Sequence, residues 1–388
     1  MENEKKCRIC GGTDLVLKLD LGSHPPSDGF LTKEQLSEPE IHYPLQLYLC
    51  KTCLLVQIGY SVPPTILFGK DYPYETGVNE FGIRHFKETA KTVYNRFKPR
   101  RVVDIGSNDG TLLEAFEALG CDVLGVEPVR GIAEKAKVKT LCGFWGKDIS
   151  LPEKVDIITA CNVFAHVPDL HGFVKQIKKS LVPNGVFVFE NPFLYDMMNG
   201  FEFDTIYHEH LCYFSPKPLQ YLFKMHDMVI FDMERLPYIH GGSMRYYVGR
   251  RGEFIQTTIS HENFVEELLD DFAKGVVANK IALLDMLWKL KSDGNRIVAV
   301  SAPAKGNTLL NYCNIGPEIL DYVTEKSKLK IGRFTPGQHI PVVSDDVFHI
   351  EAPYYALLLA WNWKDQIKLA FPFFRGKWIV PLPEPHFE

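Results

Sequence analysis

The sequence predicts an α/β protein built on a doubly wound sheet, with a small β module before it and a smaller α/β domain after it. Three observations indicate this architecture. Strand-like and helix-like segments alternate from residue 101 to 190, two C-x-x-C pairs mark an N-terminal module, and a second strand–helix series follows a long amphipathic helix. With 388 residues the chain is long for one core, so two or three domains are expected.

The composition argues against several classes of protein. Apolar residues make up 46% and charged residues 23%, as in an ordinary globular protein. The net charge of −5 gives no general basic footprint for nucleic acid, so no nucleic-acid partner is expected. No run of about eighteen apolar residues exists, so no membrane partner is expected either. The start "MENEKKC" has no apolar signal core, and we therefore expect a cytoplasmic protein. We also expect it to be a monomer.

The N-terminal module, expected over residues 1–70, is defined by Cys7 and Cys10 ("CRIC") and by Cys50 and Cys53 ("CKTC"). Each pair suits a tight turn, and four thiolates match the tetrahedral preference of structural zinc. Short strands are expected at 45–50 and 54–60, and the segment "SHPPSDGFL" must loop out. The alternative is four unrelated free cysteines. The other five, which lie among apolar neighbours, are expected to be packing residues: Cys121, Cys142, Cys161, Cys212 and Cys313.

The central domain is expected over residues 71–251. An amphipathic helix at 81–97 precedes strands at 101–106, 122–128, 155–164 and 185–190, which alternate with helices at 110–120, 131–140 and 170–181. Strands at 228–236 and 244–250 flank the turn "PYIHGGS" and predict an antiparallel hairpin at the edge of the sheet. The C-terminal domain, residues 252–388, should begin with a helix at about 260–291 and continue with a strand, loop and helix over 295–313. Later strands are expected at 354–363 and 377–384.

The segment "VVDIGSNDGTLLEAF" is a strand that ends in an acidic residue, followed by a glycine-containing turn and a helix start. Gly106 and Gly110 allow the turn, and amides at the helix N-terminus can face a ligand. The spacing is not that of G-x-G-x-x-G. It resembles motif I of class I S-adenosylmethionine methyltransferases, and Glu127 at the end of the next strand can accept both ribose hydroxyls. The expected cofactor-binding residues are Asp104, Gly106, Asn108, Gly110, Glu127, Asp148 (near the adenine) and Asn162.

The run Tyr207, His208, Glu209 and His210 ("YHEH") crowds four proton-handling side chains together. A metal site is one alternative. In a strand, however, the two histidines would share one face without Glu209, the spacing is not H-E-x-x-H, and the zinc already has four thiolates. Acid–base chemistry fits better. His166, which follows another strand of the same sheet, should converge on this run at the carboxyl ends of the strands.

The chain resembles, nearly end to end, the family of sugar-nucleotide C-methyltransferases that methylate C-3 of dTDP-4-keto-deoxysugars. The resemblance rests on the zinc module and on "DIGSNDGTLLE", "NVFAHVPDL", "DTIYHEHLCYFS", "HGGSMRYY", "SAPAKGNTLLNYC" and "TPGQHIP". It implies S-adenosylmethionine as cofactor and a nucleotide-linked keto-deoxysugar as substrate. It also implies that Tyr207, Glu209, His210 and His166 surround the sugar, with Tyr72 or Tyr74 approaching it from the zinc-module side.

Within this resemblance, His210 is the expected base for the C-3 proton, and Tyr207 and His166 are expected to hydrogen-bond the oxygen that becomes negative. Glu209 would orient the sugar or hold the base, and His208 is expected to be structural. The family's C-terminal domain, Rossmann-like here, closes over the nucleotide-sugar. Residues expected to meet the diphosphate or sugar are Lys305, Asn307, His240, Ser243 and Arg245. A buried structural role is the alternative for each, and the loop "YVTEKSKLKIG" departs from the family pattern.

Two other functions remain open from the sequence. An O- or N-methyltransferase acting on a sugar would use the same cofactor, but its acceptor is already nucleophilic and needs fewer acid–base groups. A protein that binds the cofactor or a nucleotide-sugar without turnover would have no need of the acid–base cluster. Because both acidic cofactor residues and four candidate acid–base groups are present, we expect an enzyme.

Overall fold

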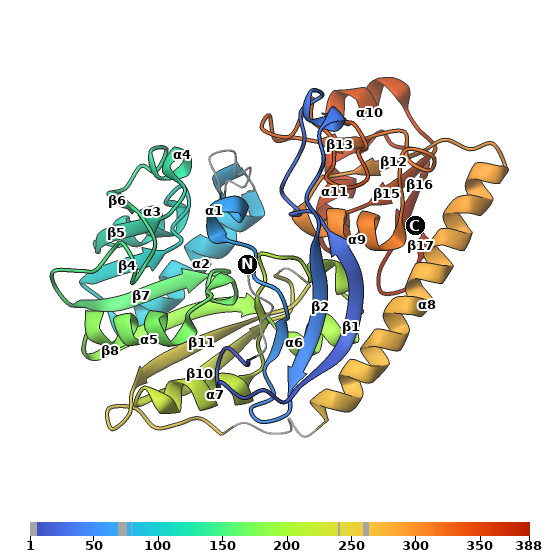
Figure 1. Cartoon of the computed structure of the whole chain (residues 1–388). Coiled ribbons are helices and arrows are strands. Elements are labelled where there is room, and N and C mark those ends of the chain that lie inside the picture. The colour runs from blue at the N-terminus through green and yellow to red at the C-terminus, as the bar shows by residue number, and fades with distance from the viewer. Residues whose placement is uncertain (1–5, 69–75, 79, 240, 259–263) are drawn as a thin grey trace.

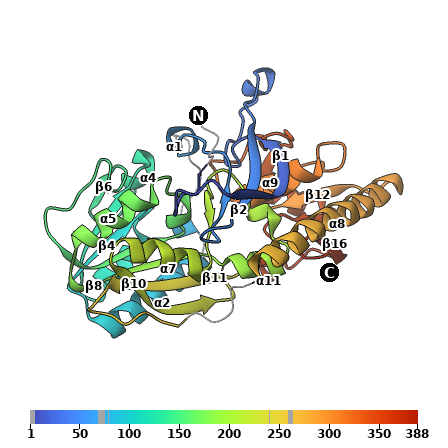
Figure 2. The ribbon, with the colours of Figure 1, turned by 60° about the horizontal axis from the view of Figure 1, so that its bottom comes forward.

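The computed structural model describes residues 6–68, 76–78, 80–239, 241–258 and 264–388. These residues form three sheets. Figure 1 shows the central sheet on one side of the molecule and the C-terminal domain on the other, with β1 and β2 running between them, and Figure 2 shows the same arrangement from a second direction. No helix in the described part of the chain is long and apolar enough to cross a membrane.

The N-terminal sheet has four antiparallel strands in the order β1-β2-β3-β9. They are β1 (Leu15–His24), β2 (Tyr43–Cys50), β3 (Val56–Ile58) and β9 (Cys212–Tyr213). In β2, Tyr43, Leu45, Leu47 and Leu49 are buried and alternate with less buried residues, which is the pattern of a strand packed on one face. The fourth strand comes from much later in the chain, directly after the YHEH run. The N-terminal module is therefore completed by a segment of the central domain.

The central sheet has the order β10-β11-β8-β7-β4-β5-β6. Its strands are β4 (Arg101–Ile105), β5 (Asp122–Glu127), β6 (Thr140–Cys142), β7 (Val155–Cys161), β8 (Leu181–Pro192), β10 (Met228–Leu236) and β11 (Ser243–Arg250). Strands β4 to β8 are parallel, and β11 runs antiparallel to both β8 and β10. The predicted doubly wound sheet and its antiparallel hairpin are confirmed, although β11 lies inside the sheet and only β10 forms the edge.

Helices cover both faces of this sheet because successive strand residues point to opposite sides. Val102 packs in one hydrophobic cluster with α2 and α3, whereas its neighbour Val103 packs in another with α5 and α7. The same division separates Ile157 from Ile158. The helices of this part are α1 (Pro64–Leu67), α2 (Glu80–Phe97), α3 (Thr111–Glu117), α4 (Arg130–Ala133), α5 (Leu170–Ser180), α6 (Leu194–Asn199) and α7 (Pro216–Met225).

The C-terminal domain contains a sheet of order β14-β13-β12-β15-β16-β17, parallel except for β17. Its strands are β12 (Ile297–Val300), β13 (Val323–Glu325), β14 (Val342–Ser344), β15 (Tyr355–Leu358), β16 (Lys377–Val380) and β17 (His386–Phe387). Its helices are α8 (Val265–Ser292), α9 (Ala304–Cys313), α10 (Asp345–Glu351) and α11 (Lys364–Ala370). The expected long helix is α8, which Figure 1 shows along the outer edge of the molecule.

The described part of the chain also contains five short 3₁₀ helices: Gln35–Ser37, Thr76–Val78, Phe164–His166, Phe203–Thr205 and Trp361–Trp363. One hydrophobic core runs through the N-terminal sheet, the central sheet and the C-terminal domain. Phe164 is at its centre, with ring centroids 5.1 Å from Phe189 and 5.3 Å from Phe214. Because the three parts share this core, side chains from all three can line one site. The predicted helix at 131–140 is wrong beyond its first turn, since α4 ends at Ala133 and β6 begins at Thr140. The described elements that the sequence prediction did not contain are β1, β6, β9, β13, β14, β17, α1, α6, α7, α10 and α11.

Candidate active site

The four cysteines of the two C-x-x-C pairs come together in the N-terminal module. Their sulfur atoms all lie within 4.8 Å of one another. The Sγ atoms of Cys7 and Cys53 are 3.4 Å apart, and those of Cys10 and Cys50 are 3.5 Å apart. Tetrahedral zinc with bonds of ~2.3 Å holds its sulfurs about 3.8 Å apart, so the cluster fits a structural zinc ion. The predicted Cys₄ zinc site is confirmed.

The other five cysteines are scattered. Cys121, Cys212 and Cys313 are buried and act as packing residues, as expected. Cys142 is exposed, so the expectation of packing was wrong there, because the short strand β6 lies at the edge of the sheet. Cys161 is half-buried and lines the cavity described next. Among the described residues, only the Cys₄ cluster groups three or more candidate metal ligands.

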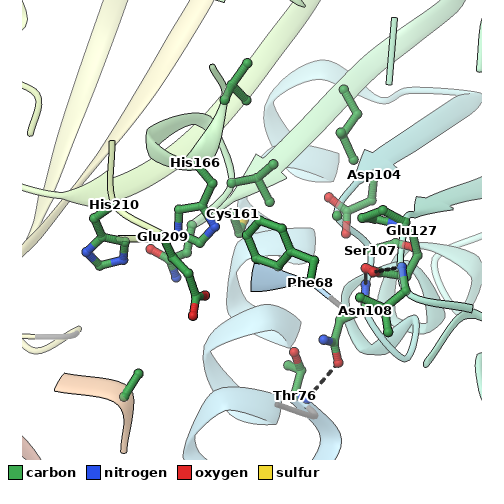
Figure 3. Close-up of a pocket in the computed structure, with 18 of the residues that line it drawn as sticks. Phe68, Thr76, Asp104, Ser107, Asn108, Glu127, Cys161, His166, Glu209 and His210 are labelled. Atoms are coloured by element: carbon green, nitrogen blue, oxygen red, sulfur yellow. Dashed lines mark hydrogen bonds between the residues drawn. The ribbon is translucent and has the colours of Figure 1, made fainter. Parts of the chain in front are cut away.

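A cavity of about 670 Å³ lies where the three parts of the chain meet. Its walls come from the carboxyl ends of β4, β5 and β7, from α2, from the YHEH run and from the start of α9. Figure 3 shows Asp104, Ser107, Asn108 and Glu127 on one side of it and His166, Glu209 and His210 on the other. Strands β5 and β7 flank β4 on opposite sides, so the cavity opens at the point where the strand order reverses, the usual ligand site in such sheets.

The turn between β4 and α3 needs its two glycines. Gly106 has φ +66°, and a Cβ there would lie 2.4 Å from Cγ2 of Val163. Gly110 has φ +86°, and a Cβ there would lie 2.9 Å from Cγ2 of Val138. Both positions therefore combine a left-handed backbone with close neighbours, which only glycine tolerates. The turn presents Gly106, Ser107 and Asn108 to the cavity.

Two buried carboxyl groups flank this turn. Asp104 accepts a hydrogen bond of 2.6 Å from the Thr159 hydroxyl, and burial raises the pKa of Asp104 to about 7 despite that bond. Glu127 accepts the backbone N–H of Asn108 at 3.0 Å and that of Val129 at 2.8 Å. Burial also raises the pKa of Glu127, and the two N–H groups oppose this shift. The two carboxylates create a strongly negative end of the cavity.

These groups fit S-adenosylmethionine. A positively charged ligand in this end of the cavity would offset the cost of burying the two carboxylates and the repulsion of Asp104 by Glu127. The buried Ser107 hydroxyl has no hydrogen-bond partner among the described residues, so it is available to a ligand. Asp104, Gly106, Asn108, Glu127 and Asn162 all line the cavity as predicted.

The YHEH run is a tight turn rather than a strand. The N–H of His210 donates to the carbonyl oxygen of Tyr207 at 2.9 Å, which brings their side chains together. The Tyr207 hydroxyl lies 2.8 Å from Nε2 of His210, and Nδ1 of His210 lies 2.8 Å from the Thr205 carbonyl oxygen. Because a carbonyl can only accept, Nδ1 carries the hydrogen and Nε2 holds the lone pair that accepts the Tyr207 hydroxyl.

His208 points away from the cavity. It is buried, and its Nε2 lies 3.2 Å from the Tyr43 carbonyl oxygen and 3.3 Å from that of Pro44, both on β2. Burial lowers the pKa of His208 to about 4, so it is neutral at physiological pH. His208 therefore attaches the turn to the N-terminal sheet, in agreement with the structural role expected of it.

His166 lies beside His210, with ring centroids 5.1 Å apart. The two are brought together because the N–H of Leu211 donates to the Ala165 carbonyl oxygen at 2.9 Å. Burial holds the pKa of His166 well below its usual value, and the neighbouring His210 lowers it further, so the ring is neutral. Its Nε2 is buried and has no hydrogen-bond partner among the described residues. Glu209, 4% exposed, also lines this part of the cavity.

The C-terminal domain contributes two lysines to the cavity wall, Lys305 at the start of α9 and Lys330. The Lys305 ammonium lies 4.1 Å from the Trp361 ring centroid and 4.0 Å from a carboxylate oxygen of buried Asp204. Burial lowers the pKa of Lys305, whereas Asp204 and Glu202 oppose this. The Lys330 ammonium donates to the Ala302 carbonyl oxygen at 2.8 Å and lies 3.4 Å from Asp28, which reaches the cavity from the N-terminal insertion.

Several predicted residues do not line the cavity. Asp148 is exposed and accepts the N–H of Phe144 within its own loop. Gly110 shapes the turn from behind. Asn307 is buried and donates to the Ser27 carbonyl oxygen at 2.6 Å. Ser243 is buried and donates to the Ile239 carbonyl oxygen. Tyr72, Tyr74 and His240 lie outside the described residues.

Arg245, expected at the substrate, instead holds a buried carboxylate. Its Nε donates to Glu190 at 2.7 Å, and Nη2 donates to Thr89 at 2.7 Å. Burial alone would raise the pKa of Glu190, but His85 and Arg245 together lower it to about 2. Glu190 in turn lies 2.7 Å from Nε2 of His85, a residue of α2 that lines the cavity. The sequence prediction missed His85, Lys330 and Asp28, since no local motif marks residues that only tertiary packing brings to a site.

Comparisons with known proteins agree with this geometry. The family model described as a zinc binding domain matches residues 7–68, a methyltransferase domain matches 81–230, and a C-methyltransferase C-terminal domain matches 238–383. C-methyltransferase NovU from Streptomyces niveus is 30% identical over 404 aligned positions, which cover 98% of this chain and 96% of that protein. The chain belongs to the C-methyltransferase family.

Other similarities of this C-methyltransferase are narrower. A ubiquinone biosynthesis O-methyltransferase from Bradyrhizobium sp. (strain ORS 278) is 31% identical over 121 residues, or 29% of this chain and 47% of that protein. Among solved structures, an S-adenosylmethionine-dependent methyltransferase from Clostridium acetobutylicum ATCC 824 matches 44% of this chain and 92% of its own, with 14% identity and a TM-score of 0.37. The CcbJ methyltransferase from Streptomyces caelestis matches 43% of this chain and 90% of its own, with 12% identity and a TM-score of 0.36.

The C-methyltransferase is thus an S-adenosylmethionine-dependent enzyme of the class I methyltransferase fold, with a structural zinc module and a small-molecule substrate. Its central sheet is the predicted doubly wound sheet, and Gly106 and Asn108 of the cofactor loop, the turn between β4 and α3, line the cavity as expected from the sequence.

Proposed function

We propose that this C-methyltransferase methylates the carbon next to the ketone of a nucleotide-linked 4-keto-deoxysugar, at C-3 of the sugar. The observation that supports this most directly is the Tyr207–His210 pair beside His166, across the cavity from the cofactor loop. Carbon becomes nucleophilic here only if its proton is removed and the adjacent oxygen is stabilised. The cavity supplies separate groups for the two tasks.

His210 is the proposed base. Its Nδ1–H is fixed on the Thr205 carbonyl oxygen, so the lone pair of Nε2 faces the cavity side of the ring, where Tyr207 lies. When the Tyr207 hydroxyl turns from Nε2 to donate to the ketone oxygen of the substrate, the lone pair of Nε2 becomes free. Nε2 then takes the proton from the substrate carbon, and the electrons of that C–H bond form the enolate. The Tyr207 hydroxyl remains as a donor to the enolate oxygen.

His166 is the proposed second donor to that oxygen. Because the ring is neutral, its Nε2 can carry a hydrogen and donate it without a competing charge. Such a preorganised donor contributes roughly 3 kcal/mol to transition-state stabilisation. When bound, S-adenosylmethionine supplies the methyl group, whose bond to the sulfonium breaks as the new carbon–carbon bond forms. Glu209, buried in the same wall, would hold the sugar in place.

Lys305 and Lys330 are proposed to bind the diphosphate of the nucleotide. Both ammonium groups lie on the cavity wall of the C-terminal domain, and their side chains are only 13% and 9% exposed. An anion that displaces water from two such groups forms strong charge-assisted hydrogen bonds. Lys305 also stands at the N-terminal end of α9, whose free N–H groups favour an anion.

The proposal also includes a monomeric enzyme in a reducing compartment such as the cytoplasm. One chain supplies residues of all three of its parts to the cavity, so the site needs no partner subunit, and Cys7, Cys10, Cys50 and Cys53 form no disulfides. Light scattering of the purified enzyme, with substrate present, tests the monomer directly.

The substrate is tested by incubating the enzyme with S-adenosylmethionine and a panel of nucleotide-linked 4-keto sugars. We expect one methyl group to be added, and NMR of the product to place it on C-3. A methyl group found on oxygen would instead support the alternative O-methyltransferase.

The base is tested by exchange of the C-3 proton with deuterium oxide. His210→Ala should abolish this exchange, because Nε2 is the acceptor of that proton, while binding of S-adenosylmethionine shows that the variant is folded. Exchange at the original rate in His210→Ala would exclude His210 as the base.

A further inference from the structure

The zinc knuckle and the catalytic turn are joined by one arginine. Arg8 lies between the zinc ligands Cys7 and Cys10 in the sequence, and its side chain is buried. Its Nη1 donates to the Ile58 carbonyl oxygen at 2.7 Å and to the Leu211 carbonyl oxygen at 3.4 Å. Its Nη2 donates to the Ser61 hydroxyl at 2.8 Å. One guanidinium therefore bridges the knuckle, β3 and the residue that follows His210.

The backbone of Leu211 is held from two sides. Its carbonyl oxygen accepts the N–H of Ile58 at 3.0 Å in addition to Arg8. Its own N–H donates to the Ala165 carbonyl oxygen, next to His166. These bonds fix the peptide planes before and after Leu211. Because the first of these planes contains the carbonyl of His210, they also fix the direction in which His210 leaves the turn.

A second contact reinforces the same connection. Gln57 is fully buried in β3, and its side-chain oxygen accepts the backbone N–H of Arg8 at 2.9 Å. Gln57 also pairs in register with Cys212 of β9, two residues after His210. The knuckle, β3 and β9 are thus tied through both the backbone and the side chain of Arg8.

We propose that Arg8 is a positioning residue for methyl transfer: it holds the turn of Tyr207 and His210 in place beside His166, and it makes the position of this turn depend on the zinc knuckle. The inference rests on the proposed role of His210 as the base. A misplacement of about 1 Å at a reacting group costs on the order of 100-fold in rate, so a small shift of the turn is sufficient for a large effect. The cofactor loop is built from β4, β5 and α3, and the side-chain hydrogen bonds of Arg8 described above go to Ile58, Leu211 and Ser61, outside that loop.

The test uses the full-length, zinc-loaded enzyme and the variants Arg8→Met and Arg8→Lys. We expect Arg8→Met to lower kcat by roughly 10- to 100-fold while the Kd for S-adenosylmethionine is unchanged. Arg8→Lys, which keeps one donor, should recover part of the loss. Arg250→Met is the matched control, because Arg250 also donates to two carbonyl oxygens, those of Lys178 and Leu181, away from the turn. It should lower the Tm without lowering kcat.

A second measurement does not need the sugar. In enzyme labelled with nitrogen-15 histidine, the His210 signals, assigned with His210→Gln, should report hydrogen on Nδ1. In Arg8→Met we expect a mixture of the two ring tautomers, because the bond to Thr205 loosens with the turn. Unchanged His210 signals in Arg8→Met would overturn the inference. If no keto-sugar is methylated, the proposed substrate fails, but the His210 signals still decide the role of Arg8.

Discussion

Asp104 holds a carboxyl group that water hardly reaches, at the negative end of the cavity. It is 4% exposed, and burial raises its pKa to about 7, with Glu127 and Glu190 adding repulsion. Close to neutral pH this group is therefore divided between its neutral and ionised forms. A cationic cofactor binds the ionised form more tightly, because only that form offers a full negative charge.

We therefore predict that binding of S-adenosylmethionine weakens as the pH falls below about 7, by about tenfold for each pH unit, because one proton must leave Asp104 on binding. Above that pH the carboxylate is already ionised and the Kd should level off. Isothermal titration calorimetry over this range measures the effect. Asp104→Asn should bind weakly and show a much flatter pH dependence, and an equally steep dependence in Asp104→Asn would assign the proton to another group.

The residues of the cofactor loop could be predicted from the sequence because they are neighbours along the chain. The order strand, acidic residue, glycine turn and helix determines their geometry locally. Arg245 could not be assigned in this way. Its partner Glu190 is brought to it by the pairing of β11 with β8, and local sequence patterns do not predict which strands pair or in which register. The same holds for Lys330, whose partner Asp28 comes from the far end of the sequence.

Among the elements, the turn that carries Tyr207 and His210 shows how strand pairing builds the site. One residue after it, Leu211, the chain enters β9, which pairs with β3 of the N-terminal sheet, and His208 is hydrogen-bonded to β2. The sequence indicated acid–base chemistry from residue types alone. The turn geometry, which puts Tyr207 and His210 into hydrogen-bond contact, depends on this pairing with a distant strand and was not predictable from the run itself.

The β4–α3 turn gives a prediction at the same scale. Gly106→Ala should destabilise the protein by roughly 1–3 kcal/mol beyond backbone strain, because the new Cβ meets Val163. It should also weaken binding of S-adenosylmethionine. Gly120→Ala is the control: Gly120 also has a positive φ, of +91°, but nothing lies within 4 Å of its Cβ position. Urea unfolding and calorimetry of both variants separate strain from the clash, and equal losses in the two would contradict the steric argument.

At the scale of the whole molecule, the cavity exists because three sheets share one core. The cofactor loop belongs to the central sheet, the turn of Tyr207 and His210 is attached to the N-terminal sheet, and the two lysines belong to the C-terminal domain. The sequence predicted the three parts from their separate patterns. How the parts face one another follows from contacts between distant segments, such as that of Asn307 with Ser27. These contacts could not be predicted from the sequence.

This division predicts separable effects on the two ligands. Lys305→Met or Lys330→Met should raise the KM for the nucleotide-sugar by roughly tenfold or more, the loss expected for a hydrogen bond to a charged group. Binding of S-adenosylmethionine should be unaffected, since neither lysine belongs to the cofactor loop. Lys328→Met is the matched control, because Lys328 lies two residues from Lys330 but is exposed. An unchanged KM in both cavity variants would remove the lysines from the substrate site.

Removal of zinc should disturb the turn of Tyr207 and His210 but leave the cofactor site intact. Without the metal the two cysteine knuckles lose their link, and β3 loses its anchor beside Cys50 and Cys53. We expect a chelator to lower the Tm and to reduce methyl transfer by about tenfold or more. The reason is that the position of His210 depends on the pairing of β9 with β3. Binding of S-adenosylmethionine should persist, since β4, β5 and β7 form its site.

Added zinc should restore activity, and a Cys142→Ser variant treated in parallel excludes effects at the exposed thiol. If cofactor binding and methyl transfer are lost together, the module and the central sheet unfold as one unit, and the proposed separation of their roles is wrong.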